Sequence, residues 1–489
     1  MGMDILPTEL VYAIARHADA LTLPVLRCVS SQWCALADLM RSRPKSGFRR
    51  NTCENEETHV CTLKTRCAMR YAQGLVALER WNLLEWMSDC AHNDTAHAAN
   101  DLHDFICVKA ASLGDLARLQ RQTAFPVPAR AYESAARRGH LNVLRWMLNC
   151  GVVGRSTITM HAAKGGHLHI IEWALANGCA AHVGTCTAAA KHGHLDVLQW
   201  AHAHGFPWSQ YTCASAAGGG HLDVLQWLIS HRCPWGGGIT ICAAESGHLH
   251  VLEWARDRGC LMCTSFACAR AAGSGHLHVV QWLQAHGCEW NKNVCIWAAS
   301  GGHMDVLLWA HENGCPLSKE TCEYAAKGGH LEALQWLRTN GCKWNSDTCR
   351  RAAEHGHLDV LVWARANGCP WNCDVIDSAL ARGHVHVLEW ARAHGCPWSV
   401  CSYGAAAAVE KAATNGQIGA LEWARRDGFR LDKRVYLCAA YGGHLTVLVW
   451  AKDHGCPMPT KRSSFDNRAI KHPAIYAWLD AHYAPLKTQ

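Results

Sequence analysis

One dipeptide recurs along this chain at a nearly fixed spacing, and this regularity limits what the chain can fold into. Gly-His returns at steps of 27 residues, with a single step of 28, and occurs once more near the C-terminus. The histidines are His140, His167, His194, His221, His248, His276, His303, His330, His357, His384 and His444. A Trp follows each of them by six residues. Spacing kept over so many copies indicates a repeat array, in which each unit packs against its neighbours.

Degenerate copies extend the array in both directions. Asp115, Gln417 and His472 stand where the histidine would be, and Trp423 and Trp478 follow the last two by six residues. The array therefore contains about fourteen repeats.

One clear unit, Ser209 to Trp235, predicts two short helices. The first runs from about Gln210 to Ala217, after Ser209 as a possible N-cap. The second runs from about Leu222 to Ser230 and carries a broad apolar face. A glycine usually follows it, as expected for a helix that ends with a residue in the left-handed conformation. Such short helices do not persist alone, so each repeat must bury its apolar face against its neighbours.

The stretch TCASAAGGGHLDVLQWLISHRC resembles the ankyrin repeat in its Ala-Ala-x-x-Gly-His core and in the Val-Leu pair that follows. The resemblance covers roughly residues 100–485 and implies an all-α, ankyrin-like helix–turn–helix solenoid that binds proteins. An ordinary ankyrin unit has about 33 residues, whereas this unit has 27. We therefore expect tight turns in place of projecting hairpins, and binding through helix faces.

Two further features qualify this resemblance. The step from His384 to Gln417 is 33 residues, and the insertion, near residues 399–410, is expected to form a bend or a separate binding bulge. Short, Trp-rich repeats of this kind resemble those of large DNA viruses of amoebae.

Composition excludes several classes of protein. The net charge of +7 is spread over 489 residues and forms no concentrated basic face, so we expect no nucleic-acid partner. No run of eighteen apolar residues suggests a membrane span, and the N-terminus lacks the pattern of a secretory signal. The chain is expected to be a cytoplasmic monomer, in the host cell if it is viral. The 28 cysteines recur at fixed positions in the repeat and are expected to be reduced core thiols, with disulfides or metal sites as the alternative.

The N-terminal segment, residues 5–37, resembles an F-box: Leu-Pro, then Glu-Leu, a spaced Ile, and Leu-Arg-x-Val-Ser-x-x-Trp. The resemblance implies docking on the Skp-type adaptor of a cullin–RING ubiquitin ligase. The residues that it places at or behind this interface are Leu6, Pro7, Leu10, Ile14, Leu26, Val29 and Trp33. His17 and Ala18 replace the usual Tyr-Leu before the acidic residue, a departure expected to weaken the contact with the adaptor. The alternative is an apolar cap for the solenoid.

These features predict five segments. Residues 1–40 are F-box-like, and residues 41–66 form a charged linker. For the basic cluster in this linker, a nuclear localisation signal is the alternative. Residues 67–128 hold degenerate capping repeats, residues 129–456 hold the ankyrin-like repeats, and residues 457–489 form a C-terminal capping repeat.

Several apparent sites have structural explanations. The His-x-His pairs are poor chelates, because residues two apart on a helix point to different sides; the Gly-His imidazole is expected to bond nearby backbone in a turn. Cys260 and Cys263 lack the further ligands of a zinc site. The recurrent Trp is expected to pack in the core between repeats, with a stacking ladder as the alternative, so Trp227→Ala should cost about 3–5 kcal/mol. No enzyme motif is present, and no cofactor, metal or catalytic residue is predicted.

Positions that vary between copies are better candidates for binding. The residue six before the Gly-His histidine lies on the concave face of ankyrin proteins. Side chains suited to interface hot spots occupy it in successive copies, and two charged residues stand nearby, three before their histidines. The predicted target-binding stripe consists of Arg270, Trp297, Tyr324, Arg351, Lys327 and Glu354. The alternative is a solvated helix face.

Together these features predict a scaffold for protein–protein interactions, acting as an F-box substrate receptor that brings an unknown target to a host ubiquitin ligase. The effective concentration of the target at the ligase would rise because both modules lie on one chain. The alternative is an ankyrin-repeat scaffold or decoy with no link to a ligase. A metal or redox protein is a third hypothesis, and the even spacing of the cysteines argues against it.

Overall fold

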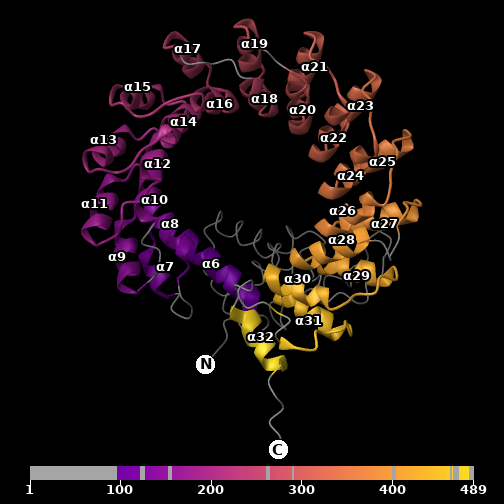
Figure 1. Cartoon of the computed structure of the whole chain (residues 1–489). Helices are drawn as coiled ribbons and strands as arrows, with labels where there is room; N and C mark the ends of the chain where they lie inside the picture. Colours follow the sequence, from indigo (N-terminus) through magenta and orange to yellow (C-terminus); the bar gives the residue numbers. More distant parts are fainter. Residues whose placement is uncertain are drawn as a thin grey trace, which may run out of the picture. The chain divides into compact units, whose positions relative to one another are not determined.

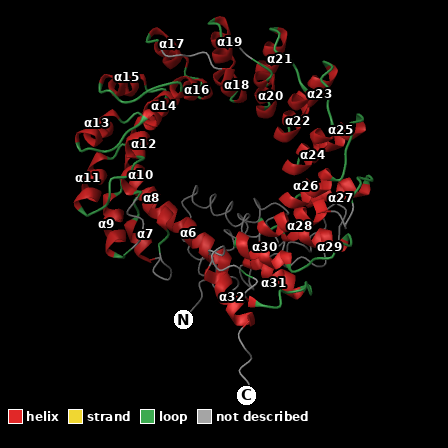
Figure 2. Cartoon of the chain, in the orientation of Figure 1, coloured by secondary structure: helices red, strands yellow, loops and turns green. Residues whose placement is uncertain are grey.

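The computed structural model describes residues 96–121, 127–151, 157–259, 265–288, 291–398, 403–462, 465 and 473–483. The predicted F-box-like segment and linker lie outside the described residues, as do Cys260, Cys263 and His472. The chain divides into two compact units, Met1–Trp208 and Ser209–Gln489. Throughout the described ranges the regular structure is helical, without strands (Figure 2). None of the described helices has the length and apolar character needed to cross a membrane.

The helices come in pairs, a first and a second helix in each repeat. In the Met1–Trp208 unit they are α6 (Ala96–Leu113), α7 (Leu116–Arg121), α8 (Ala129–Arg138), α9 (Leu141–Asn149), α10 (Ile158–Gly165), α11 (Leu168–Ala176), α12 (Thr185–His192) and α13 (Leu195–Ala203). This pairing at the predicted spacing confirms an all-α, ankyrin-like solenoid.

The same pairing continues in the Ser209–Gln489 unit. Its helices are α14 (Gln210–Gly219), α15 (Leu222–Ser230), α16 (Gly238–Glu245), α17 (Leu249–Asp257), α18 (Ser265–Gly273), α19 (Leu277–Ala285), α20 (Asn293–Gly301), α21 (Met304–Glu312), α22 (Lys319–Gly328), α23 (Leu331–Thr339), α24 (Ser346–His355), α25 (Leu358–Ala366), α26 (Asp374–Arg382), α27 (Val385–Ala393), α28 (Tyr403–Thr414), α29 (Ile418–Arg426), α30 (Arg434–Gly442), α31 (Leu445–Asp453) and α32 (Pro473–Tyr483).

The ends of these helices follow from a few side chains. Ser209 caps α14 as expected: its hydroxyl accepts a hydrogen bond from the Tyr211 N–H, and Thr212 completes a capping box. The first helix runs two residues beyond the predicted Ala217, to Gly219, and ends at Gly220 with φ +75°. The second helix, α15, has the predicted bounds.

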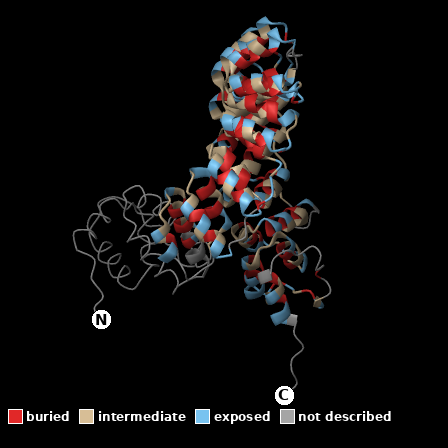
Figure 3. Cartoon of the chain, turned by 90° about the vertical axis from the view of Figure 1, so that its left-hand side faces the viewer, coloured by how far each residue is buried: buried red, intermediate tan, exposed pale blue. Residues whose placement is uncertain are grey.

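The core consists of small residues on the first helices and branched residues on the second. In the repeat that begins at Ser209, Ala216, Ala217, Val224, Leu225 and Leu228 are fully buried, and the same positions are buried along the array (Figure 3). In the Ser209–Gln489 unit, neighbouring first helices pack closely, whereas neighbouring second helices touch little. The first helices therefore lie on the inner side of the curve of this unit (Figure 1).

Within each of the two units, the Gly-His histidines pack against the preceding repeat. The Nε2 atom of His357 donates a hydrogen bond to the carbonyl oxygen of Lys327 at 3.1 Å, and His384 bonds Glu354 in the same way at 3.1 Å. The imidazole thus bonds the backbone of the preceding repeat, about one repeat away, instead of nearby backbone as predicted. Burial lowers the pKa of both histidines.

Within each unit, the glycine before most of these histidines leaves room for the imidazole of the next repeat. Gly329, which precedes His330, has φ +79°, and a Cβ placed on it would lie 2.5 Å from the Nδ1 atom of His357. Glycine is therefore needed at this position for two reasons: its backbone adopts the left-handed conformation, and it has no side chain to collide with the ring. Gly383 faces Gln417 in the same way, where the array departs from histidine.

The recurrent Trp corrects a prediction. It is half-buried on the outer edge of the second helix, and among the described repeat tryptophans only Trp450 is buried, at 3% exposure. Trp227 stacks on the His231 ring, with 4.2 Å between ring centroids. The Val and Leu positions of the second helix fill the core instead. Trp227→Ala should therefore cost less than the about 3–5 kcal/mol of a fully buried Trp.

The contact between glycine and histidine can be tested with two matched substitutions. Gly341 has φ +74°, like Gly329, but nothing lies within 4 Å of a Cβ there. We expect Gly341→Ala to cost about 1–2 kcal/mol, because it strains a left-handed backbone. Gly329→Ala should cost clearly more, because it also collides with the His357 ring. Urea unfolding followed by circular dichroism measures both; equal midpoints for the two variants would show that the imidazole contact adds nothing.

Candidate protein-binding surface

The structure places the predicted stripe on successive first helices of the Ser209–Gln489 unit. Arg270 lies on α18, Trp297 on α20, Tyr324 on α22 and Arg351 on α24, and each is half-buried. Each stands at the same place in its repeat, because the spacing of 27 residues keeps it on the same helix face. The side chains are engaged with one another and with their neighbours, so the stripe is a set of ordered clusters.

The first cluster is centred on Arg270. Its guanidinium carbon lies 4.9 Å from the centre of the Phe266 ring and 5.2 Å from that of Trp297, and its Nη1 atom lies 3.3 Å from Glu245. Phe266 is 46% exposed, so an aromatic edge remains open beside the charge. The buried Nε–H of Arg270 has no hydrogen-bond partner. Sequence reasoning missed Phe266 and Glu245, which belong to other positions of the repeat.

The second cluster is within one helix. The ammonium group of Lys327 lies 5.3 Å from the centre of the Tyr324 ring on α22, a cation–π arrangement. The backbone carbonyl of Lys327 accepts a hydrogen bond from His357, so the following repeat also contacts this part of α22.

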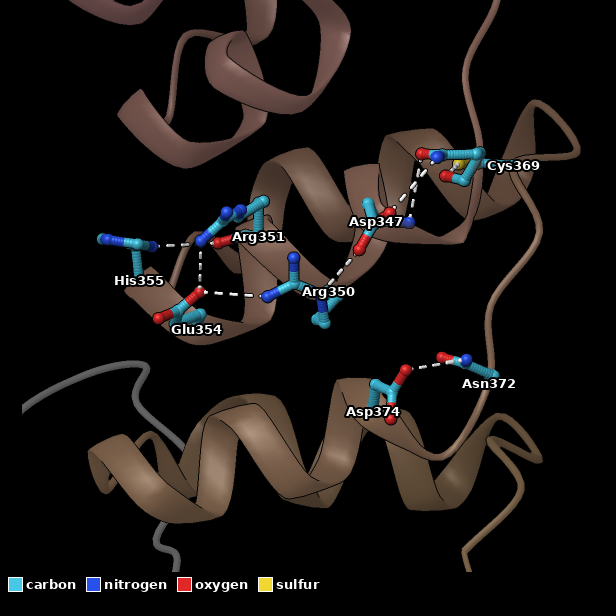
Figure 4. Close-up of polar contacts among 9 residues, drawn as sticks. Asp347, Arg350, Arg351, Glu354, His355, Cys369, Asn372 and Asp374 are labelled. Carbon is cyan, nitrogen blue, oxygen red and sulfur yellow. Dashed lines mark hydrogen bonds and ion pairs between the residues drawn. The ribbon is translucent and has the colours of Figure 1, made fainter. Parts of the chain in front are cut away.

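The third cluster joins Arg351 to Glu354 on α24 (Figure 4). Glu354 accepts from Arg351 at 3.0 Å and from Arg350 at 3.4 Å, and Arg382 on α26 lies 3.6 Å from its other oxygen. Burial acts to raise the pKa of Glu354, but the Arg351 hydrogen bond and the charges of Arg351, His355 and Arg350 outweigh it and hold the pKa below the ordinary value. One carboxylate thus links three guanidinium groups of two repeats.

A cleft of about 510 Å³ lies beside this cluster, between α24, α26 and α28. Arg350, Glu354, Arg382 and Lys411 bring charges of both signs to its walls. Arg382 is 57% exposed along its side chain, and Lys411 is exposed. The sequence carried a signal for Lys411, because it stands six residues before Gln417, at the stripe position; Arg350 and Arg382 occupy other positions and were missed.

Only one group in the described ranges brings three possible metal ligands together: Cys373, Asp374 and Asp377, whose ligand atoms lie within 4.8 Å of one another. The carboxylates already accept protein hydrogen bonds, from Asn372 to Asp374 at 2.9 Å and from the Trp398 indole to Asp377 at 2.8 Å. Burial raises the pKa of Asp377. These features suit a hydrogen-bonded helix start better than a cation site.

A model of ankyrin repeats (many copies) matches residues 186–229, which reach from α12 to α15. No curated protein matches the chain, and these comparisons give no support to the F-box resemblance or to a viral source. The match agrees with the repeated helix pairs, and ankyrin repeats point to a scaffold for protein–protein interactions.

The Glu354 cluster predicts that the stability difference between the wild type and Glu354→Gln depends on pH. Because the pKa of Glu354 is lower in the folded chain than the ordinary 4.5, its contribution to stability is complete above that value and is lost as the pH falls through the folded pKa. At neutral pH, Glu354→Gln should cost an amount between the about 0.2–1 kcal/mol of an exposed ion pair and the about 3–5 kcal/mol of a buried one.

Unfolding midpoints measured from neutral to acid pH check this expectation. The two curves should converge in acid, where Glu354 becomes neutral. The exposed Glu332 gives a matched control, and Glu332→Gln should change little. A gap between wild type and Glu354→Gln that stays constant into acid would contradict a charged Glu354 holding the three arginines.

Proposed function

We propose that this chain holds a partner protein on the inner row of first helices between α18 and α26, along the stripe and the neighbouring cleft. The observation that supports this most strongly is the contrast between positions. Within each repeat the core positions keep the same small or branched side chains, whereas the stripe position changes from Arg270 to Trp297, Tyr324 and Arg351 on an otherwise regular surface.

The side chains along this surface suit protein recognition. Arg, Trp and Tyr are the residue types that contribute most at interfaces. Arg270 is already held between two rings and Arg351 by Glu354, so little conformational entropy remains to be lost on binding. In the cleft, the exposed Arg382 and Lys411 offer donors to an acidic side chain of the partner.

A matched set of variants tests this surface. The partner is first captured by cross-linking and then purified, and its Kd is measured for each variant. Trp297→Ala and Arg351→Ala should each weaken binding about tenfold or more, as expected for hot-spot residues. Arg365→Ala on the second helix α25, where Arg365 covers the Trp371 ring at 4.3 Å, should leave the Kd unchanged. Equal effects of all three variants would place the binding surface elsewhere.

We further propose that residues 5–37 dock a Skp-type adaptor, so that the scaffold delivers its partner to a ubiquitin ligase in the cytoplasm, that of a host if the source is viral. The support is the F-box resemblance of the sequence, from Leu6-Pro7 to Trp33. Joining an adaptor-binding segment and a partner-binding array on one chain raises the effective concentration of partner at the ligase. An array without adaptor binding would act as a plain scaffold or decoy.

The adaptor proposal is tested by a titration of the purified chain against a eukaryotic Skp-type adaptor. Binding is expected for the wild type and should be lost in the double variant Leu10→Asp plus Trp33→Ala, while the helical signal of the repeats stays unchanged. Absence of binding at adaptor concentrations of about 10⁻⁵ M would leave residues 5–37 as a cap.

A further inference from the structure

Five repeats of the Ser209–Gln489 unit contain two cysteines separated by 20 residues. The first lies on the first helix, eight residues before the Gly-His histidine, and the second follows the second helix. The pairs are Cys213 and Cys233, Cys268 and Cys288, Cys295 and Cys315, Cys322 and Cys342, and Cys349 and Cys369. All ten side chains are buried, at 0–4% exposure. Four of the five pairs belong to successive repeats.

The two sulfurs of each pair are neighbours. The Sγ atoms of Cys268 and Cys288 are 2.8 Å apart, less than 1 Å longer than the about 2.05 Å of a disulfide bond. In the other four pairs the contact between the two thiols raises the pKa of the first cysteine and lowers that of the second. Every described cysteine is a thiol, so these contacts are between reduced groups.

In four of the five pairs the second cysteine also contacts a backbone carbonyl just before the first helix. The Sγ atom of Cys342 lies 3.1 Å from the carbonyl oxygen of Ser318, and that of Cys369 lies 3.4 Å from the carbonyl oxygen of Asn345. Ser318 and Asn345 are the N-cap residues of the first helices of these repeats. The loop after the second helix is thus already closed against the start of the first, and little backbone movement separates the two sulfurs from a bond.

The pairing also makes the two thiols chemically unequal. The hydrogen bond from the Cys322 thiol lowers the pKa of Cys342, and the same contact, together with burial, raises the pKa of Cys322. The thiolate is the nucleophile in disulfide exchange. The second cysteine, which lies in the loop, is therefore the one suited to react first.

Other repeats show that packing alone does not require two cysteines. Phe206 stands opposite Cys186, Tyr436 opposite Cys456, and Thr159 opposite Cys179. These residues are buried at the same places in their repeats. A pair of contacting thiols is therefore a property of five particular repeats, beyond what the fold demands.

We propose that these five pairs are sites of reversible oxidation to disulfides within single repeats, with a small-molecule disulfide as the oxidant. The loop thiolate attacks one sulfur of the small disulfide, which releases one small thiolate and leaves a mixed disulfide on the loop cysteine. The first-helix thiol then loses its proton and attacks the protein sulfur of that mixed disulfide, which releases the second small thiol. Two protein thiols are oxidised, and one small disulfide is reduced to two thiols.

The first attack requires the loop after the second helix to open locally, because the sulfurs are buried. The reaction should therefore take minutes to hours, the ordinary range for uncatalysed disulfide rearrangement. Once formed, each bond ties a first helix to its loop and restricts the unfolded chain.

The pairs lie directly behind the proposed binding surface. Cys268, Cys295, Cys322 and Cys349 stand two residues before Arg270, Trp297, Tyr324 and Arg351 on the same helices. Oxidation would therefore fix the helices that present the stripe. This last consequence depends on the proposed function, whereas formation of the disulfides does not.

The test uses the full chain and needs no partner protein, so its outcome is independent of the proposed function. The folded chain is equilibrated with oxidised glutathione, denatured, alkylated with iodoacetamide, digested and mapped by mass spectrometry. We expect five cross-linked peptide pairs, one for each cysteine pair, each lacking two hydrogen atoms and each lost after dithiothreitol. Cys186, which faces Phe206, and the exposed Cys150 should not take part in any of these cross-links.

Single substitutions test whether each cross-link joins the expected pair of cysteines. Cys322→Thr, which places there the residue found at Thr240, should remove one cross-link and leave the other four, whereas Cys186→Thr should remove none. The oxidised wild type should also unfold at a higher urea concentration than the reduced chain. Full alkylation of all ten cysteines after oxidation, or cross-links that join different repeats, would overturn the proposal; the wild-type map decides this even if a variant fails to fold.

Discussion

The contact between one imidazole and one glycine of the preceding repeat connects the units of this solenoid. The His357 ring occupies the space left by the missing side chain of Gly329 and bonds the carbonyl of Lys327. A helix of nine residues has little stability of its own, so the register between neighbouring repeats must be set by contacts that leave no alternative. An imidazole that fits against a glycine provides such a contact at junctions within each unit, and several of these rings also bond the backbone of the preceding repeat.

Because these positions and the Ala, Val and Leu core fix the stack, the remaining face of each first helix can change from copy to copy. Arg270 is placed between the Phe266 and Trp297 rings by neighbouring repeats, and Glu354 gathers guanidinium groups from α24 and α26. The surface is therefore both variable in sequence and ordered in structure, a combination that favours selective binding over general adhesion.

Much of the fold could be predicted because its signals are local. Ser209, the Gly-His pair and the apolar positions of the second helix determine where helices begin, end and face, and α15 has the bounds expected from them. The half-burial of the Trp was missed, because an apolar residue at the edge of a face looks like a core residue in a linear pattern. The contacts of Arg270 with Trp297 and of Glu354 with Arg382, and the cleft at Lys411, depend on residues in adjacent repeats and on the longer helix α28, which no single repeat encodes.

Each repeat with a Gly-His pair contains both halves of the junction, a glycine for the next histidine and a histidine for the previous glycine. Duplication or deletion of a whole unit therefore creates no new kind of boundary: the joined ends meet through the same groups as before. The length of such an array can drift through unequal exchange between gene copies, while each protein so produced keeps a complete set of contacts. The pairing of Gly383 with Gln417 across the 33-residue step shows that an irregular spacing can also be accommodated when another polar side chain reaches the same place.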